Sequence, residues 1–240
     1  MMLRLLAAIL ALVPAQALAD VTARYSMGKD VLTVEVDDGG NSRLGIEGMF
    51  SLIRRDGYDY VVMIPPGGEA KVTELGALMQ IMAGAMQDQK PPAGMFPEPK
   101  FALVLKGDVT VGGRAGTLWS FGPMAQPGDP KPQRAIELTM SADPALAPVG
   151  EVFRRTVMAL LPQFSAIVPE SSGFAPQAAE LMAKGTPLRI DKKFELQSVE
   201  TAEIDPKRFE LPAPVISAVE FMTAMEPGGG GGGVEFNSLP

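Results

Sequence analysis

The chain has 240 residues with 28 acidic and 21 basic side chains, a formal net charge of −7, and neither cysteine nor histidine. Without histidine there is no Ser-His-Asp or Cys-His catalysis and no histidine-ligated zinc or copper, although hydrolysis by carboxylates or by Ser-Lys stays open. Without cysteine there are no disulfides and no lipid-modified cysteine. No basic cluster stands out, since pairs such as Arg54-Arg55 and Lys192-Lys193 are isolated. The acidic balance therefore argues against nucleic acid and anionic lipid as partners.

The first residues have the features of a secretory signal peptide. Arg4 precedes the apolar run Leu5–Val13, and Ala17-Leu18-Ala19 is a small-residue cleavage site. The apolar run is too short to span a bilayer, and no later segment reaches the roughly 18 apolar residues of a transmembrane helix. We therefore expect residues 1–19 to be removed, and the mature protein to be periplasmic or secreted with no integral membrane segment.

Alternation of apolar and polar residues predicts a series of short antiparallel strands. Turn sequences such as Asp37–Asn41 and Asp56-Gly57 separate them. The expected strands are Val21–Met27, Val31–Val36, Leu44–Ile46, Met49–Arg54, Tyr58–Ile64, Phe101–Val111, Ala115–Gly122, Ala135–Ser141, Leu188–Ile190 and Phe194–Ile204.

Apolar residues at steps of three and four predict helices between and after these strands. The first expected helix has Thr73 as its N-cap, and Gly185 is expected just past the end of the third. The expected ranges are Thr73–Asp88, a second helix from Asp143 to Phe164, Ala175–Lys184 and Val215–Met225. The six glycines that follow, Gly228–Gly233, cannot build a core. We expect one β-rich exported domain over residues 20–226 and a disordered tail over 227–240.

The order of these elements resembles a known superfamily. The stretches that carry the resemblance are Gly185–Arg189, Phe194–Val199, Phe209–Pro212, Ala115–Trp119 and Met140–Pro144. They resemble the periplasmic lipoprotein carriers, with LolA, LolB and RseB-type domains, and a similar family of exported domains of unknown function. The resemblance implies an α+β fold in which a curved antiparallel β-sheet, a half-barrel, has two or three helices packed on its concave face. It supplies no site residue, because no lipid-contacting motif of those carriers maps onto this chain.

The most suggestive surface is a methionine-rich face on the first helix. Methionine is flexible and polarizable, so it adapts to ligands of irregular shape. The candidate ligand-binding residues are Leu75, Met79, Met82 and Met86 on this helix, together with the only tryptophan, Trp119. The competing interpretation is that these methionines simply fill the core between helix and sheet.

Other motifs have ordinary explanations. Asp37, Gly39 and Asn41 loosely suggest a calcium loop but lack its further ligands, so a hairpin turn is favoured. The pairs Asp56/Asp59 and Glu195/Glu200 are expected to be solvated carboxylates. Tyr58 and Tyr60 share one side of a strand, where they would line a sugar or peptide site or pack across strands.

We expect a non-catalytic exported protein without metal or cofactor. The leading hypothesis is a binding protein that holds a lipid or a lipoprotein acyl chain between sheet and helices. The alternative is a structural or interaction protein of the cell envelope with a filled core, and an enzyme comes third. A continuous apolar cavity of at least about 300 Å³ would favour the first hypothesis, and a solid core the second.

Overall fold

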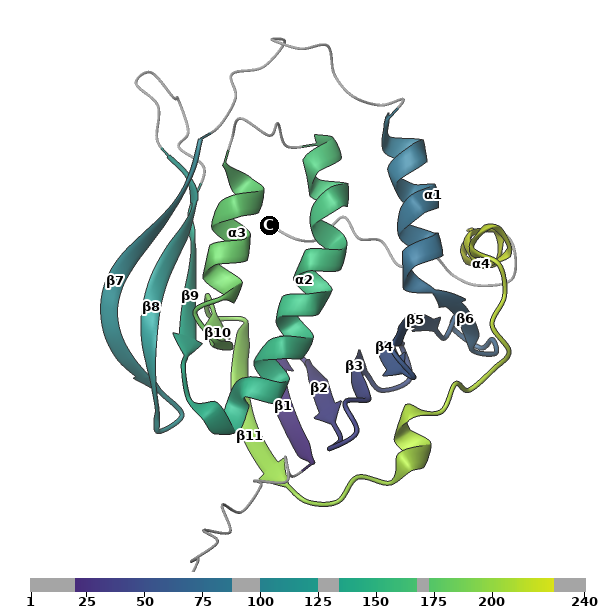
Figure 1. Cartoon of the computed structure of the whole chain (residues 1–240), viewed down its shortest axis with the longest axis horizontal. Coiled ribbons are helices and arrows are strands. Elements are labelled where there is room, and N and C mark those ends of the chain that lie inside the picture. Colours follow the sequence, from purple (N-terminus) through teal and green to yellow (C-terminus); the bar gives the residue numbers. More distant parts are fainter. Residues whose placement is uncertain (1–19, 88–99, 125–133, 168–172, 227–240) are drawn as a thin grey trace, which may run out of the picture.

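The computed structural model describes residues 20–87, 100–124, 134–167 and 173–226. The expected signal peptide (1–19) and the expected disordered tail (227–240) lie outside these ranges. Eleven described strands form one open antiparallel sheet in the order β6-β5-β4-β3-β2-β1-β11-β10-β9-β8-β7 (Figure 1). The prediction of an α+β fold built on a large antiparallel sheet is confirmed at this level.

The strands follow the sequence alternation closely. Their bounds are β1 Val21–Met27, β2 Asp30–Val36, β3 Ser42–Ile46, β4 Phe50–Arg55, β5 Tyr58–Met63, β6 Lys71–Glu74, β7 Phe101–Val111, β8 Arg114–Pro123, β9 Ile136–Ser141, β10 Thr186–Ile190 and β11 Phe194–Thr201. The closing hairpin returns to the start of the chain, because β11 pairs with β1 from Val21↔Thr201 to Met27↔Phe194.

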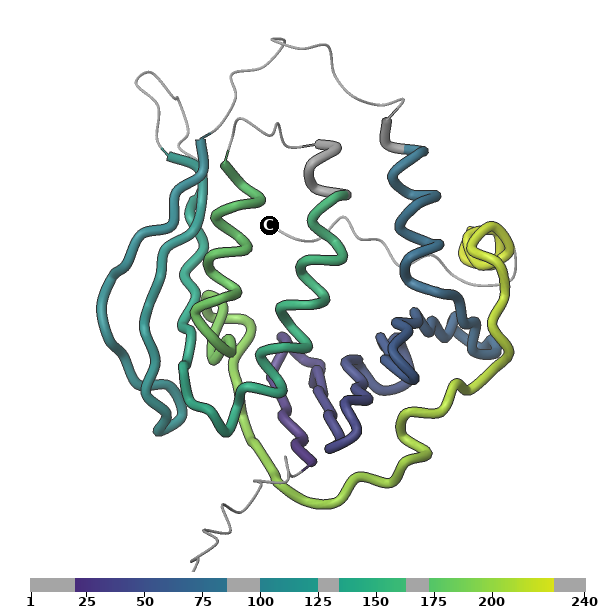
Figure 2. The backbone as a smooth tube through the Cα atoms, viewed as in Figure 1, coloured from purple at the N-terminus to yellow at the C-terminus, as the bar shows by residue number. Residues whose placement is uncertain are grey.

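Three helices stand side by side against one face of the sheet, and a fourth lies beside the β6 edge (Figures 1 and 2). They are α1 Leu75–Gln87, α2 Ala147–Ile167, α3 Phe174–Met182 and α4 Ala218–Met225. The apolar stripe of α2 packs over the centre of the sheet, where Val149 and Val152 are buried against residues of β1, β2 and β10. None of the described helices has the length and apolar character needed to cross a bilayer.

The first helix begins later than its sequence pattern predicts. Lys71–Glu74 is strand β6, paired with Tyr60–Met63 of β5. Thr73 is therefore not an N-cap: it is fully buried in the strand, and its hydroxyl donates to the carbonyl of Ile216 at 3.0 Å. Pairing with a neighbouring strand has overridden the local helical signal, as tertiary context often does.

The C-terminal segment 202–217, which we name the strap, covers the opposite face of the sheet. It leaves β11, forms a short 3-10 turn at Pro206–Phe209 and continues to α4 (Figure 1). Its Leu211 and Ala213 pack against a buried cluster of Ile53, Val62 and Val72. The sheet is thus covered by helices on one face and, along β3–β6, by the strap on the other.

Tyr25 of β1 lies in the centre of the core. Its ring stacks on Phe194 at 4.7 Å between centroids and meets Phe153 edge to face at 5.3 Å. The side chain is fully buried, and its hydroxyl has no hydrogen-bond partner among the described residues. Burial raises the pKa of Tyr25 well above its ordinary value, against the opposing effect of the nearby Arg114 guanidinium. The fold therefore favours the neutral phenol.

We expect Tyr25→Phe to leave stability at neutral pH within about 1 kcal/mol, since no hydrogen bond to a described residue is lost. The raised pKa of Tyr25 in the folded state links stability to pH. The free energy of unfolding keeps the full contribution of the neutral phenol below about pH 10 and loses it as the pH rises further. Urea unfolding at neutral and alkaline pH should show a shallower alkaline decline for Tyr25→Phe. Tyr58→Phe, at an exposed tyrosine, is the control. A parallel decline in Tyr25→Phe and the parent would contradict the prediction.

Candidate functional site

The methionine-rich face of α1 forms part of an apolar cluster between α1, α2, α4 and the sheet. Leu75 and Leu78 are buried there against Val61 of β5 and Phe221 of α4. Met79 and Met82 are only half-buried, as are Leu52 and Met63 on the sheet and Ala159 on α2. Among the described residues, half-buried apolar side chains outnumber buried ones in this cluster, unlike in the central core around Tyr25. Side chains of this cluster are therefore partly accessible to solvent, as are those of the cluster between α2 and α3.

The candidate residues predicted from the sequence fall into two groups. Leu75, Met79 and Met82 belong to the α1 cluster. Met86 lies on α1, but its side chain is outside the described part of the structure. Trp119 of β8 belongs to a different cluster, with Met158 and Leu161 of α2 and residues of α3. Because α2 stands between α1 and α3 (Figure 1), these residues do not line one continuous surface.

Trp119 has a polar environment that its sequence position does not reveal. The ammonium of Lys184 lies 5.0 Å from the centre of the indole ring, a cation–π contact. The same ammonium forms an ion pair with Glu180 at 3.0 Å, one turn earlier on α3. The indole N–H is buried and has no acceptor among the described residues.

A polar cluster lies below the α1 methionines, where α2 meets strands β3, β4 and β5. Arg54 donates to Asp59 at 2.8 Å, and Arg155 of α2 approaches the other oxygen of Asp59 at 3.4 Å. Arg155 also donates to the Ser42 hydroxyl at 2.7 Å. Burial lowers the pKa of Arg155, and the Asp59 carboxylate opposes that shift. The prediction of a solvated Asp59 is wrong, because the sheet brings this carboxylate between two guanidinium groups; Asp56 is exposed, as expected.

The space at this polar cluster is small. It encloses about 10 Å³ between Ser42, Arg54, Asp59, Leu75 and Arg155, which is room for one water molecule. A larger hollow of about 730 Å³ lies at the β7–β8 hairpin, where Arg114 and Asp143 form an ion pair at 3.2 Å. That hollow is open and edged by charged side chains, so it does not suit an acyl chain.

The remaining sequence candidates have structural roles. Tyr60 packs on the far face of the sheet, beside the strap, whereas Tyr58 is exposed, so the pair does not form a closed aromatic site. The Asp37 carboxylate accepts from the backbone N–H of Asn41 at 2.7 Å, as in a hairpin turn. Within the described ranges, no three acidic side chains come together as a metal site.

Comparison with known proteins assigns no family to the chain. No protein-family model, no curated protein and no solved structure matches it. Any function must therefore be argued from its own residues and geometry.

Proposed function

We propose that this protein is a non-catalytic exported binding protein that holds an apolar ligand, such as a lipid or a lipoprotein acyl chain, between the sheet and helices α1 and α2. The observation that carries the proposal is the half-buried cluster around Met79 and Met82, where flexible side chains of α1 face apolar side chains of the sheet and α2. A sheet covered on one face by helices also accords with the half-barrel carriers that the sequence resembles.

In this proposal the structure represents a closed form. The polar cluster at the floor leaves about 10 Å³, so an acyl chain enters only when α1 shifts away from α2. Two features of α1 accord with such a shift. Its contacts include half-buried methionines, which can repack around a new neighbour. Gly76 and Gly84 each lower its intrinsic helix stability by about 1 kcal/mol relative to alanine.

Met82→Ala tests the binding site directly. We expect it to weaken binding of a fluorescent fatty acid about fivefold to tenfold, because the ligand loses part of its apolar contact. The free energy of unfolding should fall by only about 1 kcal/mol, less than the 2–5 kcal/mol of a fully buried methionine. Fluorescence titration and urea unfolding provide the two measurements. Ile81→Ala, at an exposed position of the same helix, is the control and should leave binding unchanged.

The filled central core favours a second candidate function, an interaction protein of the cell envelope without a small-molecule ligand. In that case the parent protein binds no fatty acid, and Met82→Ala costs as much as a core deletion. Native mass spectrometry of the protein purified from its own envelope separates the two functions, because a carrier should retain lipid.

A further inference from the structure

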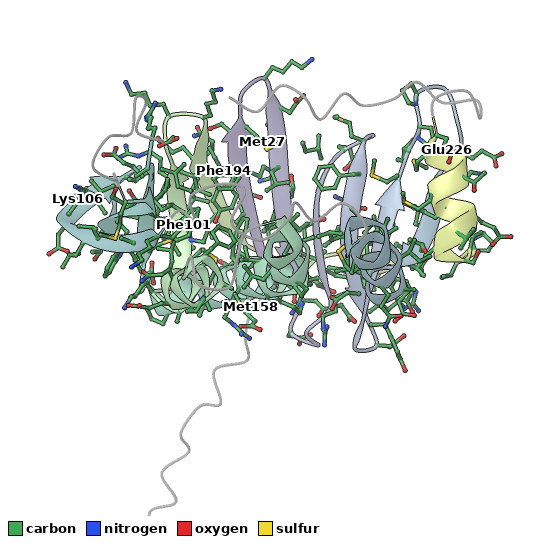
Figure 3. The ribbon with its side chains drawn as sticks, turned by 90° about the horizontal axis from the view of Figure 1, so that it is seen from above. Met27, Phe101, Lys106, Met158, Phe194 and Glu226 are labelled. Carbon is green, nitrogen blue, oxygen red and sulfur yellow. The ribbon has the colours of Figure 1, made fainter. Side chains whose placement is uncertain are left out.

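Four connections meet along one end of the sheet. They join β1 to β2 at 27–30, β3 to β4 at 46–50, β5 to β6 at 63–71 and β10 to β11 at 190–194. Because β6-β5-β4-β3-β2-β1-β11-β10 are consecutive neighbours, these connections form one row, which we name the hairpin rim. Figure 3 looks along the helices and shows Met27 at the tip of the β1–β2 hairpin, which projects away from the helices.

The hairpin rim exposes large apolar side chains at three of its four connections. They are Met27 (37 % exposed), Val31 (49 %), Met49 (42 %) and Ile64 (38 %). At the opposite ends of the same strands, Tyr58 is the exposed large apolar side chain among the described residues, and many acidic side chains lie at the same end. The acids at that end include Asp20, Asp37, Asp38, Asp56, Glu203 and Asp205, against the exposed bases Arg55 and Lys207.

Backbone hydrogen bonds hold neighbouring connections of the rim together. The N–H of Ile64 donates to the carbonyl of Met49 at 2.9 Å, and the N–H of Gly28 donates to the carbonyl of Lys193 at 3.2 Å. The apolar side chains therefore occupy fixed positions on paired hairpins. They protrude from the end of a sheet, a shape suited to entering a soft surface.

The charges at the rim differ from those of the chain as a whole. Lys29, Lys192 and Lys193 are exposed there, and none of the three forms an ion pair with a described carboxylate. Of the acids at the rim, Glu47 is paired with Arg43 and Arg208, and Asp191 with Arg134. The others are Asp30, Glu69 and Glu195. The rim thus lacks the strong negative charge of the opposite end, although the protein carries a net charge of −7.

We propose that the hairpin rim is a docking surface for a phospholipid membrane. The side chains of Met27, Val31, Met49 and Ile64 enter the interface between headgroups and acyl chains, while Lys29, Lys192 and Lys193 lie at the level of the phosphates.

A membrane fits better than a protein partner, because these apolar side chains stand on separate protruding tips instead of lining a groove. The acidic end of the strands then points away from the lipid. The acidic net charge argues against anionic lipid only if the charge is evenly distributed, and in this proposal the uneven distribution removes that objection.

Vesicle co-flotation tests the proposal on the whole protein. We expect binding to vesicles of phosphatidylethanolamine and phosphatidylglycerol, and weaker binding to phosphatidylcholine alone. The double substitution Met49→Ser and Ile64→Ser should weaken binding about tenfold or more, since it removes two inserted side chains. Lys192→Gln should weaken it about fivefold on anionic vesicles only. Tyr58→Ser at the opposite end and Lys106→Gln on β7 are matched controls that should change nothing.

Because the chain contains no cysteine, a single introduced thiol can report depth. A polarity-sensitive dye on Met49→Cys should shift to the blue when vesicles are added, and the same dye on Tyr58→Cys should not. Absence of vesicle binding by the parent, equal losses in the control variants, or equal shifts at both dye positions would overturn the proposal. Fatty-acid binding is measured without vesicles, so failure of the ligand site and failure of the rim are told apart.

Discussion

Replacing Gly185 by alanine is expected to destabilise the protein by about 4 kcal/mol. Gly185 connects α3 to β10 with a φ of +129°, a conformation that L-residues with a side chain rarely adopt. A Cβ at this position would overlap the carbonyl oxygen of Ser141 and lie 2.8 Å from its carbonyl carbon. Both contacts are to the backbone of β9, so relief requires β10 and β9 to move apart just where Thr186 pairs with Ser141.

Gly84→Ala is the matched control for this substitution. Gly84 lies in α1, where an added Cβ would meet nothing within 4 Å. Alanine there should stabilise the protein by up to about 1 kcal/mol through helix propensity. Urea unfolding of the two variants should therefore move the midpoint in opposite directions. A Gly185→Ala midpoint at or above that of the parent would show that the contact between β9 and β10 is not as close as described.

The sequence predicted the elements formed by local patterns. Alternation located most strands to within a few residues, and Asp56-Gly57 forms the expected turn between β4 and β5. The sequence predicts a third helix over Ala175–Lys184 with Gly185 just past its end. The helix instead ends at Met182 with Ala183 as its C-cap, and Gly185 is needed for the close approach to Ser141. Local composition therefore singles out Gly185, but it does not predict the close contact with Ser141 that requires a glycine.

The features missed from the sequence depend on long-range pairing. β6 has four residues and no distinctive alternation, so only its pairing with β5 defines it. The cluster of Arg54, Asp59 and Arg155 joins two strands to a helix that follows about a hundred residues later. The hairpin rim likewise appears only when four separate connections are placed side by side by the strand order. Periodicity within one segment contains no information about which segments become neighbours.

The strap is held to the sheet by an ion pair between a partly exposed arginine and a buried carboxylate, which composition does not reveal. Arg208 donates to both oxygens of Glu35 on β2, at 2.9 and 3.0 Å. The Glu35 side chain is only 8 % exposed, and its other basic neighbour, Arg43, is 3.4 Å away. Next to Arg208, Phe209 is buried. The pair therefore fixes the strap at the point where it crosses the far face of the sheet.

Arg208→Met is expected to lower the free energy of unfolding by about 2–3 kcal/mol, because it leaves the buried Glu35 carboxylate with the longer contact to Arg43 alone. This cost is below that of a fully buried pair, since the Arg208 side chain is 37 % exposed.

The control is Arg24→Met, which breaks an exposed pair with Glu200 and should cost less than about 1 kcal/mol. In a Glu35→Gln background, Arg208→Met should cost much less, because no buried charge is left behind. Urea unfolding of the parent, Arg208→Met, Glu35→Gln and the double variant completes the double-mutant cycle. Amide exchange of residues 202–217 should accelerate in Arg208→Met. Equal costs for Arg208→Met in the parent and in the Glu35→Gln background would mean that packing of the strap, and not this ion pair, holds it in place.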